Sequence, residues 1–190
     1  MPNKKIPVKA NYNALDFLAQ DHRDVIRLFE QFRQLRHDKN SSIEQQEIFE
    51  DAKEEIMIEA CSLLTMHAQM EEEIFYPALR NAIDDPRLID EAELEHQMVQ
   101  QLITELEDMG PGDEFYDANF AVLSEYARHH IEVEEKEIFS KARRAKLDLD
   151  ELGMALDRRK NELIAAAGLE DYEQAQEFVQ RDDFDEVNQH

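Results

Sequence analysis

Apolar side chains recur at intervals of three and four residues along four long stretches of this chain. That spacing predicts helices that each bury one face, running from Leu15 to Leu35, from Ser42 to about Asn81, from Asp85 to about Met109 and from Asp113 to about Lys146. Four Gly and five Pro among 190 residues are few, which disfavours a turn-rich β fold. Four helices with short connections are expected to form an all-α, up-down-up-down four-helix bundle.

Local signals predict where these helices begin and end. Ser42 followed by Gln45 is the pattern of a capping box, in which each side chain hydrogen-bonds the backbone of the other residue. Pro77 is expected to kink or stop the last turns of the same helix, because proline has no backbone N–H. Asp85 is expected to cap the third helix, and Gly110 to end it.

A fifth helix is expected after the bundle. Leucine and isoleucine recur at helical spacing between Asp148 and Ala167, which predicts a helix against the bundle or against a partner. The chain is therefore divided into a flexible leader (1–12), a bundle domain (13–146) and a C-terminal helical extension with an acidic tail (147–190). This extension is the expected contact surface for a homodimer or a partner protein.

Charge and cysteine content exclude several classes of function. The chain has 45 Asp plus Glu against 21 Lys plus Arg, a net charge of −24. This charge repels nucleic-acid phosphates and anionic lipid, so no binding to nucleic acid or membrane is expected. Cys61 is the single cysteine, which excludes an intrachain disulfide and a thiolate-rich metal site. Residues 1–10 lack the apolar core of a signal peptide, and a cytoplasmic location is expected.

The histidines follow an approximate internal repeat of helix pairs. The first and third expected helices each carry an acidic residue, then a histidine, then apolar residues at helical spacing, which turns the histidine inward. The second and fourth each carry His-x-x-x-Glu, whose four-residue step puts both side chains on one face. Each helix therefore sends a histidine toward the bundle axis, and two helices add a carboxylate. The set is His22, His67, Glu71, His96, His130 and Glu134.

A bound metal explains this set better than core packing does. A single inward histidine is more often a hydrogen-bonded core residue than a ligand, but an unpaired buried polar group costs about 1–3 kcal/mol and a carboxylate costs more. Four imidazoles and two carboxylates suit iron, manganese or zinc. Six ligands exceed the four of a tetrahedral zinc site, so two cations bridged by Glu71 and Glu134 are expected. The ferritin-like arrangement needs Glu-x-x-His on two helices, and Leu64 and Ala127 stand where two of those glutamates would be.

Four short motifs carry a family resemblance: Asp21-His22, the stretch from His67 through Glu71-Glu72 to Pro77, Glu95-His96, and the stretch from His130 to Glu134-Glu135. With these motifs the chain resembles the hemerythrin-like proteins that contain the HHE cation-binding domain, over roughly residues 13–145. The resemblance implies a hemerythrin-like bundle with a non-haem di-iron centre. It implies that the six residues above bind two iron ions, which are also bridged by a solvent-derived oxo or hydroxo group.

The resemblance further implies that a small ligand, O2, NO or a peroxide, binds at the iron for sensing, storage or stress protection. Oxygen-carrying members hold a fifth histidine on the third helix, whereas Ala92 and Gln100 stand four residues either side of His96. A centre with four histidines and two glutamates resembles instead the bacterial sensors and repair proteins that respond to nitric oxide. Two alternatives stay open: a di-iron oxidoreductase that consumes peroxide or NO, and a metal-stabilised helical interaction module.

Other side chains near the expected centre have weaker patterns. Tyr126 stands four residues before His130 and is expected on the inward face, either as a hydrogen-bond donor to a bound oxygen species or as a core aromatic. Cys61 is expected to pack as a small buried hydrophobe. Glu72 and Glu135 either accept imidazole N–H bonds or, as the pattern favours, face solvent.

Overall fold

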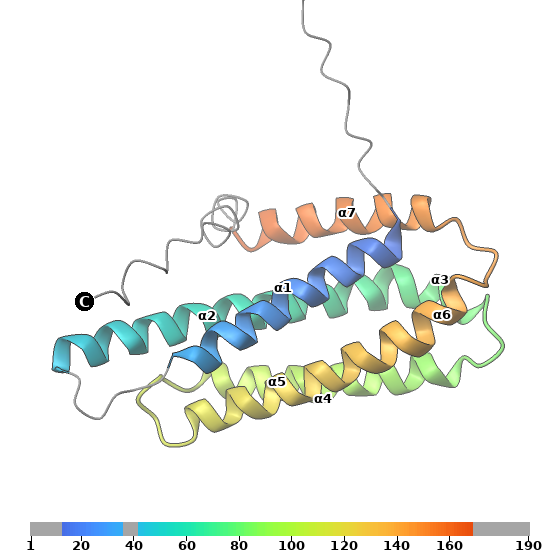
Figure 1. Cartoon of the computed structure of the whole chain (residues 1–190). Coiled ribbons are helices and arrows are strands. Elements are labelled where there is room, and N and C mark those ends of the chain that lie inside the picture. Colours follow the sequence, from blue (N-terminus) through green and yellow to red (C-terminus); the bar gives the residue numbers. More distant parts are fainter. Residues whose placement is uncertain (1–12, 36–41, 169–190) are drawn as a thin grey trace, which may run out of the picture.

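The computed structural model describes residues 13–35 and 42–168 of the chain. The helical segments follow in the order α1 (Ala14–Gln34), α2 (Ile43–Met70), η1 (Glu71–Phe75), α3 (Tyr76–Arg80), α4 (Arg87–Glu107), α5 (Tyr116–Val133), η2 (Glu134–Ile138), α6 (Phe139–Ala142) and α7 (Leu149–Ala166). The segments α2, η1 and α3 form one rod, and α5, η2 and α6 form another (Figure 1). No strand occurs in the described part of the chain, so the predicted all-α class is confirmed.

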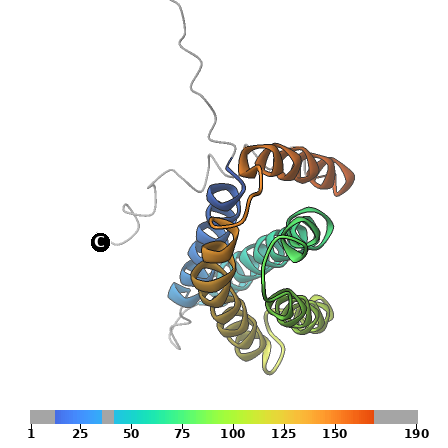
Figure 2. The same ribbon diagram turned by 90° about the vertical axis from the view of Figure 1, so that its right-hand side faces the viewer.

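The four rods pack as an up-down-up-down bundle. Helix α1 packs against α2 and α5, and α4 packs against the same two helices, so rods that follow one another in the chain are neighbours around the bundle axis. Figure 2 shows α7 outside these four rods. The predicted four-helix bundle with an additional C-terminal helix is confirmed.

A single π turn interrupts the second rod and another interrupts the fourth. These turns, η1 and η2, begin at Glu71 and Glu134. In each, a backbone N–H reaches back five residues, from Tyr76 to the carbonyl of Glu71 and from Phe139 to the carbonyl of Glu134. A π turn widens the helix by one residue and changes which later side chains share a face with earlier ones.

The second rod begins at the predicted cap and ends at Arg80, close to the predicted end near Asn81, so Pro77 does not stop it. Ser42 and Gln45 form the capping box in both directions. The Gln45 backbone nitrogen lies 3.3 Å from Ser42 Oγ, and the Ser42 backbone nitrogen lies 3.0 Å from Gln45 Oε1. The helix continues past Pro77 to Arg80. Ser140 occupies the place of Pro77 in the repeat, so a π turn in this position does not require the proline.

The third and fourth helices begin later than predicted. Helix α4 begins at Arg87, and the predicted cap, Asp85, instead pairs with the Arg87 side chain. Helix α5 begins at Tyr116, because Phe115 has a φ of 77° and a left-handed residue cannot continue a right-handed helix. The Asp113 carboxylate, which was expected to lie at the start of α5, accepts the N–H of Gly110 at 2.8 Å.

Two apolar clusters fill the bundle on either side of a buried polar layer. One cluster holds the second half of α1, the middle of α2 and the facing parts of α4 and α5. The other holds the start of α1, the start of α4, η1 with α3, and α6, and Leu156 of α7 closes it. The polar layer between them consists of His22, His67, Glu71, His96, His130 and Glu134.

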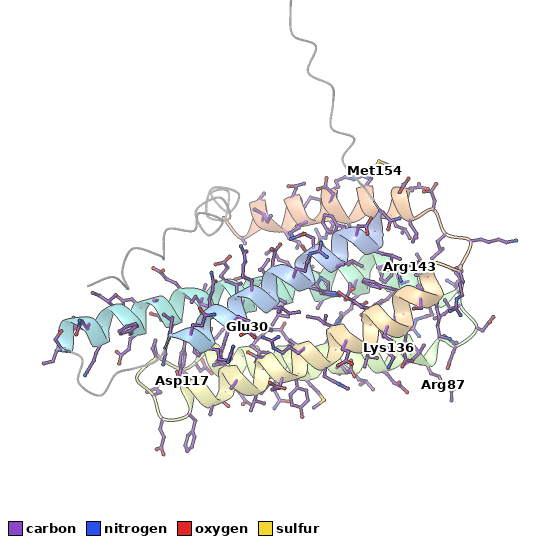
Figure 3. The ribbon with its side chains drawn as sticks, viewed as in Figure 1. Glu30, Arg87, Asp117, Lys136, Arg143 and Met154 are labelled. Atoms are coloured by element: carbon purple, nitrogen blue, oxygen red, sulfur yellow. The ribbon has the colours of Figure 1, made fainter. Side chains whose placement is uncertain are left out.

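Helix α7 lies along the outside of the bundle, against α1 and in contact with α2 and η1 (Figure 1). Asp148 caps it by accepting the N–H of Glu151 at 3.0 Å. Leu156 is fully buried, whereas Met154 is exposed and points away from the bundle (Figure 3). The predicted fifth helix is confirmed, and it packs on the bundle.

The three-part division of the chain stays a prediction, because the leader (1–12) and the tail (169–190) lie outside the described residues. None of the helices in the described part is long and apolar enough to cross a membrane.

Candidate metal centre

The polar layer draws one histidine from each of the four rods. The histidines come from α1, α2, α4 and α5, and the two glutamates stand at the first residues of the π turns η1 and η2. All six side chains belong to residues that are at most 7% exposed. The structure therefore brings together the six residues that the sequence pattern singled out: His22, His67, Glu71, His96, His130 and Glu134.

The imidazole Nε2 atoms point inward and meet in two pairs. The Nε2 atoms of His22 and His67 are 3.1 Å apart, and those of His96 and His130 are also 3.1 Å apart. At this distance the two nitrogens of a pair can share one proton, and the same lone pairs can bind one cation. Each pair thus offers two nitrogen ligands that could hold one cation.

The two glutamates lie between these pairs. Glu71 Oε2 is 3.3 Å from Nε2 of His67 and 3.4 Å from Nε2 of His96, so it reaches both pairs. Glu134 Oε2 is 3.2 Å from Nε2 of His22. Within residues 13–35 and 42–168, two groups of ligating atoms lie within 4.8 Å of one another: His22, His67, Glu71 and Glu134 in the first, and Glu71, His96 and His130 in the second.

The four Nδ1 atoms point outward, and each faces a carboxylate. The distances are 2.8 Å from His22 to Glu135, 3.0 Å from His96 to Glu72, 2.8 Å from His130 to Glu95 and 3.6 Å from His67 to Asp21. An Nδ1–H that is donated to a carboxylate leaves Nε2 free to bind a metal and makes the imidazole more basic. Glu72 and Glu135 were favoured as solvent-facing residues, and the structure gives each a histidine partner while leaving it half exposed.

Burial and mutual repulsion act on the two central carboxylates. Burial raises the pKa of Glu134, and the nearby Glu71 charge raises it further. Burial also acts to raise the pKa of Glu71, but His67 and His96 outweigh it and hold that pKa well below its usual range. Burial disfavours charge on His67 and His96 as well, yet the facing carboxylates raise the pKa of both. Glu71 and the imidazoles of His67 and His96 thus favour each other's charged forms, and a bound cation would act on the carboxylate in the same way.

Tyr76 holds the two central carboxylates together. Its hydroxyl lies 3.0 Å from Glu71 Oε2 and 3.2 Å from Glu134 Oε1, and its ring stacks on His96. A five-residue step on a regular α-helix would turn Tyr76 about 140° away from Glu71, so the π turn η1 is what brings them together. The sequence reasoning missed this role; the signal available was a tyrosine beside a His-x-x-x-Glu motif where the repeat has Phe139.

Tyr126 is placed differently from its prediction. It is 43% exposed, so it neither donates to the centre nor packs in the core, and the inward prediction is wrong. At 100° per residue Tyr126 lies about 40° to one side of His130, whereas the buried residues of α5 lie to the other side. His130 is therefore at the edge of the buried stripe, and Tyr126 falls beyond it. His129 is exposed.

A small cavity adjoins the four histidines on the side away from Tyr76. Its volume is about 20 Å³. Its apolar wall includes Val25, Leu63, Val99 and Ile131. A space of roughly 10–15 Å³ holds one water molecule, so this cavity fits a water or a diatomic molecule and excludes an organic substrate.

Comparisons with known proteins agree with this arrangement. The family model described as the hemerythrin HHE cation binding domain matches residues 13–142. A crystal structure of a hemerythrin HHE cation-binding domain-containing protein from Mycobacterium kansasii is similar, with a TM-score of 0.66 and 20% sequence identity, over 84% of this chain and 92% of that chain. No curated protein matches the chain significantly. At 20% identity the structural likeness bears on the fold, and the family match extends it to the cation-binding domain.

Proposed function

This chain belongs to the hemerythrin HHE cation-binding domain family, and on that premise we propose that it holds two iron ions and reversibly binds a small ligand, O2, NO or a peroxide. The proposed role is sensing, storage or stress protection. Bound iron would supply redox-variable binding of the small ligand, and a solvent-derived oxo or hydroxo group would be part of the proposed cofactor. The proposed iron ligands are His22, His67, Glu71, His96, His130 and Glu134.

The chemistry of the donor set supports binding of two cations. Each Nε2 pair offers two inward lone pairs, and Glu71 reaches both pairs at 3.3 and 3.4 Å. Among the described residues, Glu71 Oε1 is buried without a hydrogen-bond donor. An unpaired buried oxygen is costly, and coordination to a cation removes that cost. The carboxylates that lie 2.8–3.0 Å from Nδ1 of His22, His96 and His130 hold these imidazoles in the tautomer that metal binding needs.

The cavity beside the histidines is the observation that carries the small-ligand part of the proposal. With a volume of about 20 Å³ and largely apolar walls, it has room for O2 or NO beside the four histidines and leaves no room for a larger substrate. The apolar side chains also keep bulk water from the centre. The cytoplasmic location and a partner-binding role of the C-terminal helix stay predictions.

Metal analysis together with spectroscopy tests this function. Protein from iron-replete cells should contain about two irons per chain, and exposure to O2 or NO should change its visible spectrum without continuous consumption of the ligand. Loading with zinc alone would refute the iron assignment. Sustained consumption of peroxide or NO would favour the oxidoreductase alternative, and a metal-loaded protein whose spectrum responds to none of these ligands would favour the interaction module.

Two neighbouring histidines provide a matched pair of variants. His130→Ala removes a proposed ligand at the centre, and His129→Ala removes an exposed imidazole from the adjacent position. We expect the first variant to lose at least one metal per chain while circular dichroism shows a folded bundle, and the second to keep both. Full metal retention in folded His130→Ala would refute the ligand assignment.

A further inference from the structure

The four carboxylates that face the Nδ1 atoms are not equivalent. Glu72, Glu95 and Glu135 lie 2.8–3.0 Å from their histidines, and their side chains are 32–46% exposed. Asp21 is different: its side chain is 6% exposed, and it stands 3.6 Å from Nδ1 of His67. In the described part of the chain, neither Asp21 Oδ2 nor His67 Nδ1 has a hydrogen-bond partner.

Helix α7 places a cation beside Asp21. Lys160 of α7 donates from Nζ to Asp21 Oδ1 at 2.5 Å, and its ammonium lies 5.4 Å from the centre of the Phe17 ring. Helix α7 packs on the α1 side of the bundle. Glu95 holds the place of Asp21 in the internal repeat, and no lysine or arginine of residues 13–35 or 42–168 forms an ion pair with it. The helix extension thus contributes a cation to one metal position alone.

We propose that Lys160 is a positioning residue that weakens metal binding at the position formed by His22 and His67, by holding Asp21 away from Nδ1 of His67. A carboxylate that accepts Nδ1–H makes the imidazole a stronger metal ligand. Because Asp21 binds the Lys160 ammonium instead, His67 lacks this effect. The two metal positions therefore differ in affinity because of α7. The inference rests on the proposed function, since it concerns the same pair of metal positions.

Stepwise titration with Co²⁺ under exclusion of oxygen tests the inference, because visible absorption of Co²⁺ reports its ligands and competition with a chelator yields each dissociation constant. Lys160→Met should tighten one of the two binding steps by about tenfold, the scale on which outer partners of metal-bound histidines act, and leave the other within about twofold. Lys160→Arg keeps the charge and the donor, and should retain wild-type constants within about twofold. Lys160→Gln, which can still donate to Asp21, should tighten the same step to a smaller extent and serves if Lys160→Met does not fold.

Two controls separate this role from a general effect of α7. Arg159 stands beside Lys160 on α7 and binds Glu73 at 2.7 Å, so Arg159→Met removes a neighbouring cation without touching Asp21 and should change neither step. In an Asp21→Asn background, Lys160→Met should change neither constant more than about twofold, because residues that act through one contact are not additive.

The outcomes distinguish the inference from the function on which it rests. A wild-type protein that binds no Co²⁺ would refute the proposed metal centre and the inference with it. Two bound Co²⁺ ions with constants that Lys160→Met leaves unchanged or weakens would overturn the inference alone. Tightening that persists in full in the Asp21→Asn background would show that the Lys160 charge acts directly on the cation, which would overturn its role as a positioning residue.

Discussion

Replacing Tyr76 with phenylalanine is expected to destabilise the protein without metal and to cost much less with metal bound. The Tyr76 hydroxyl lies 3.0 Å from Glu71 Oε2 and 3.2 Å from Glu134 Oε1, and Tyr76 is fully buried. The hydroxyl has one hydrogen and donates to one carboxylate at a time. Its removal should therefore lower the free energy of unfolding by about 2 kcal/mol, the contribution of one charge-assisted hydrogen bond. The packing cost should be small, because Phe139 fills the corresponding place in the repeat.

Urea unfolding followed by circular dichroism measures this effect. At a slope of about 2 kcal/mol per molar urea, a loss of about 2 kcal/mol lowers the midpoint by about 1 M. Bound cations take over the carboxylate charges, so the shift in Co²⁺-loaded protein should be less than about half as large. Tyr126→Phe, which removes an exposed hydroxyl, is the control and should leave the midpoint unchanged. An unchanged midpoint for Tyr76→Phe would refute the role of the hydroxyl, and an equal loss with metal would show that packing rather than charge is responsible.

Three further perturbations test other parts of the structure. Glu95→Gln removes the carboxylate that faces Nδ1 of His130 and should weaken metal binding about 10–100-fold in chelator competition. Burial raises the pKa of the Cys61 thiol to about 12; since the thiolate is the reactive form, a thiol reagent at about pH 8 should react only after unfolding. Leu156→Ala opens a cavity where α7 closes the core and should cost about 3 kcal/mol, lowering Tm by roughly 6–12 °C, whereas Met154→Ala on the exposed face of α7 should change Tm little.

Each of these expectations has an outcome that contradicts it. Wild-type metal affinity in Glu95→Gln would show that the Nδ1 partner does not influence the ligand. Rapid labelling of Cys61 in folded protein would show that the helix around it opens easily. Equal Tm values for Leu156→Ala and wild type would show that α7 is not packed on the bundle as described.

Helical periodicity made the convergence of the six central side chains predictable. The apolar stripe of each helix determines which way it faces the core, and a histidine on that stripe must face the same way. The His-x-x-x-Glu spacing adds a glutamate one turn further along. The capping box at Ser42 and the Asp148 cap of α7 are local in the same sense, because all their atoms lie within four residues of sequence.

The two tyrosines show where this reasoning stops. Tyr126 was placed inward by counting four residues from His130, but His130 lies at the edge of the buried stripe of α5. Counting residues on a regular helix could not place Tyr76, because the π turn that begins at Glu71 changes the helix face on which Tyr76 lies. A shift of one residue rotates a side chain by about 100° around the helix axis, which is enough to move it from a buried face to an exposed one.

The sequence by itself determined the helices, their inward faces and the residues that meet at the centre, since these depend on interactions within one helix. The tertiary structure alone decided what surrounds that centre: the carboxylate facing each Nδ1, the hydroxyl between Glu71 and Glu134, the cavity of about 20 Å³ and the reach of Lys160 to Asp21. These features join side chains of different rods, or of one rod across a π turn. They depend on how far each helix is shifted and rotated against its neighbours, which no local spacing in the chain specifies.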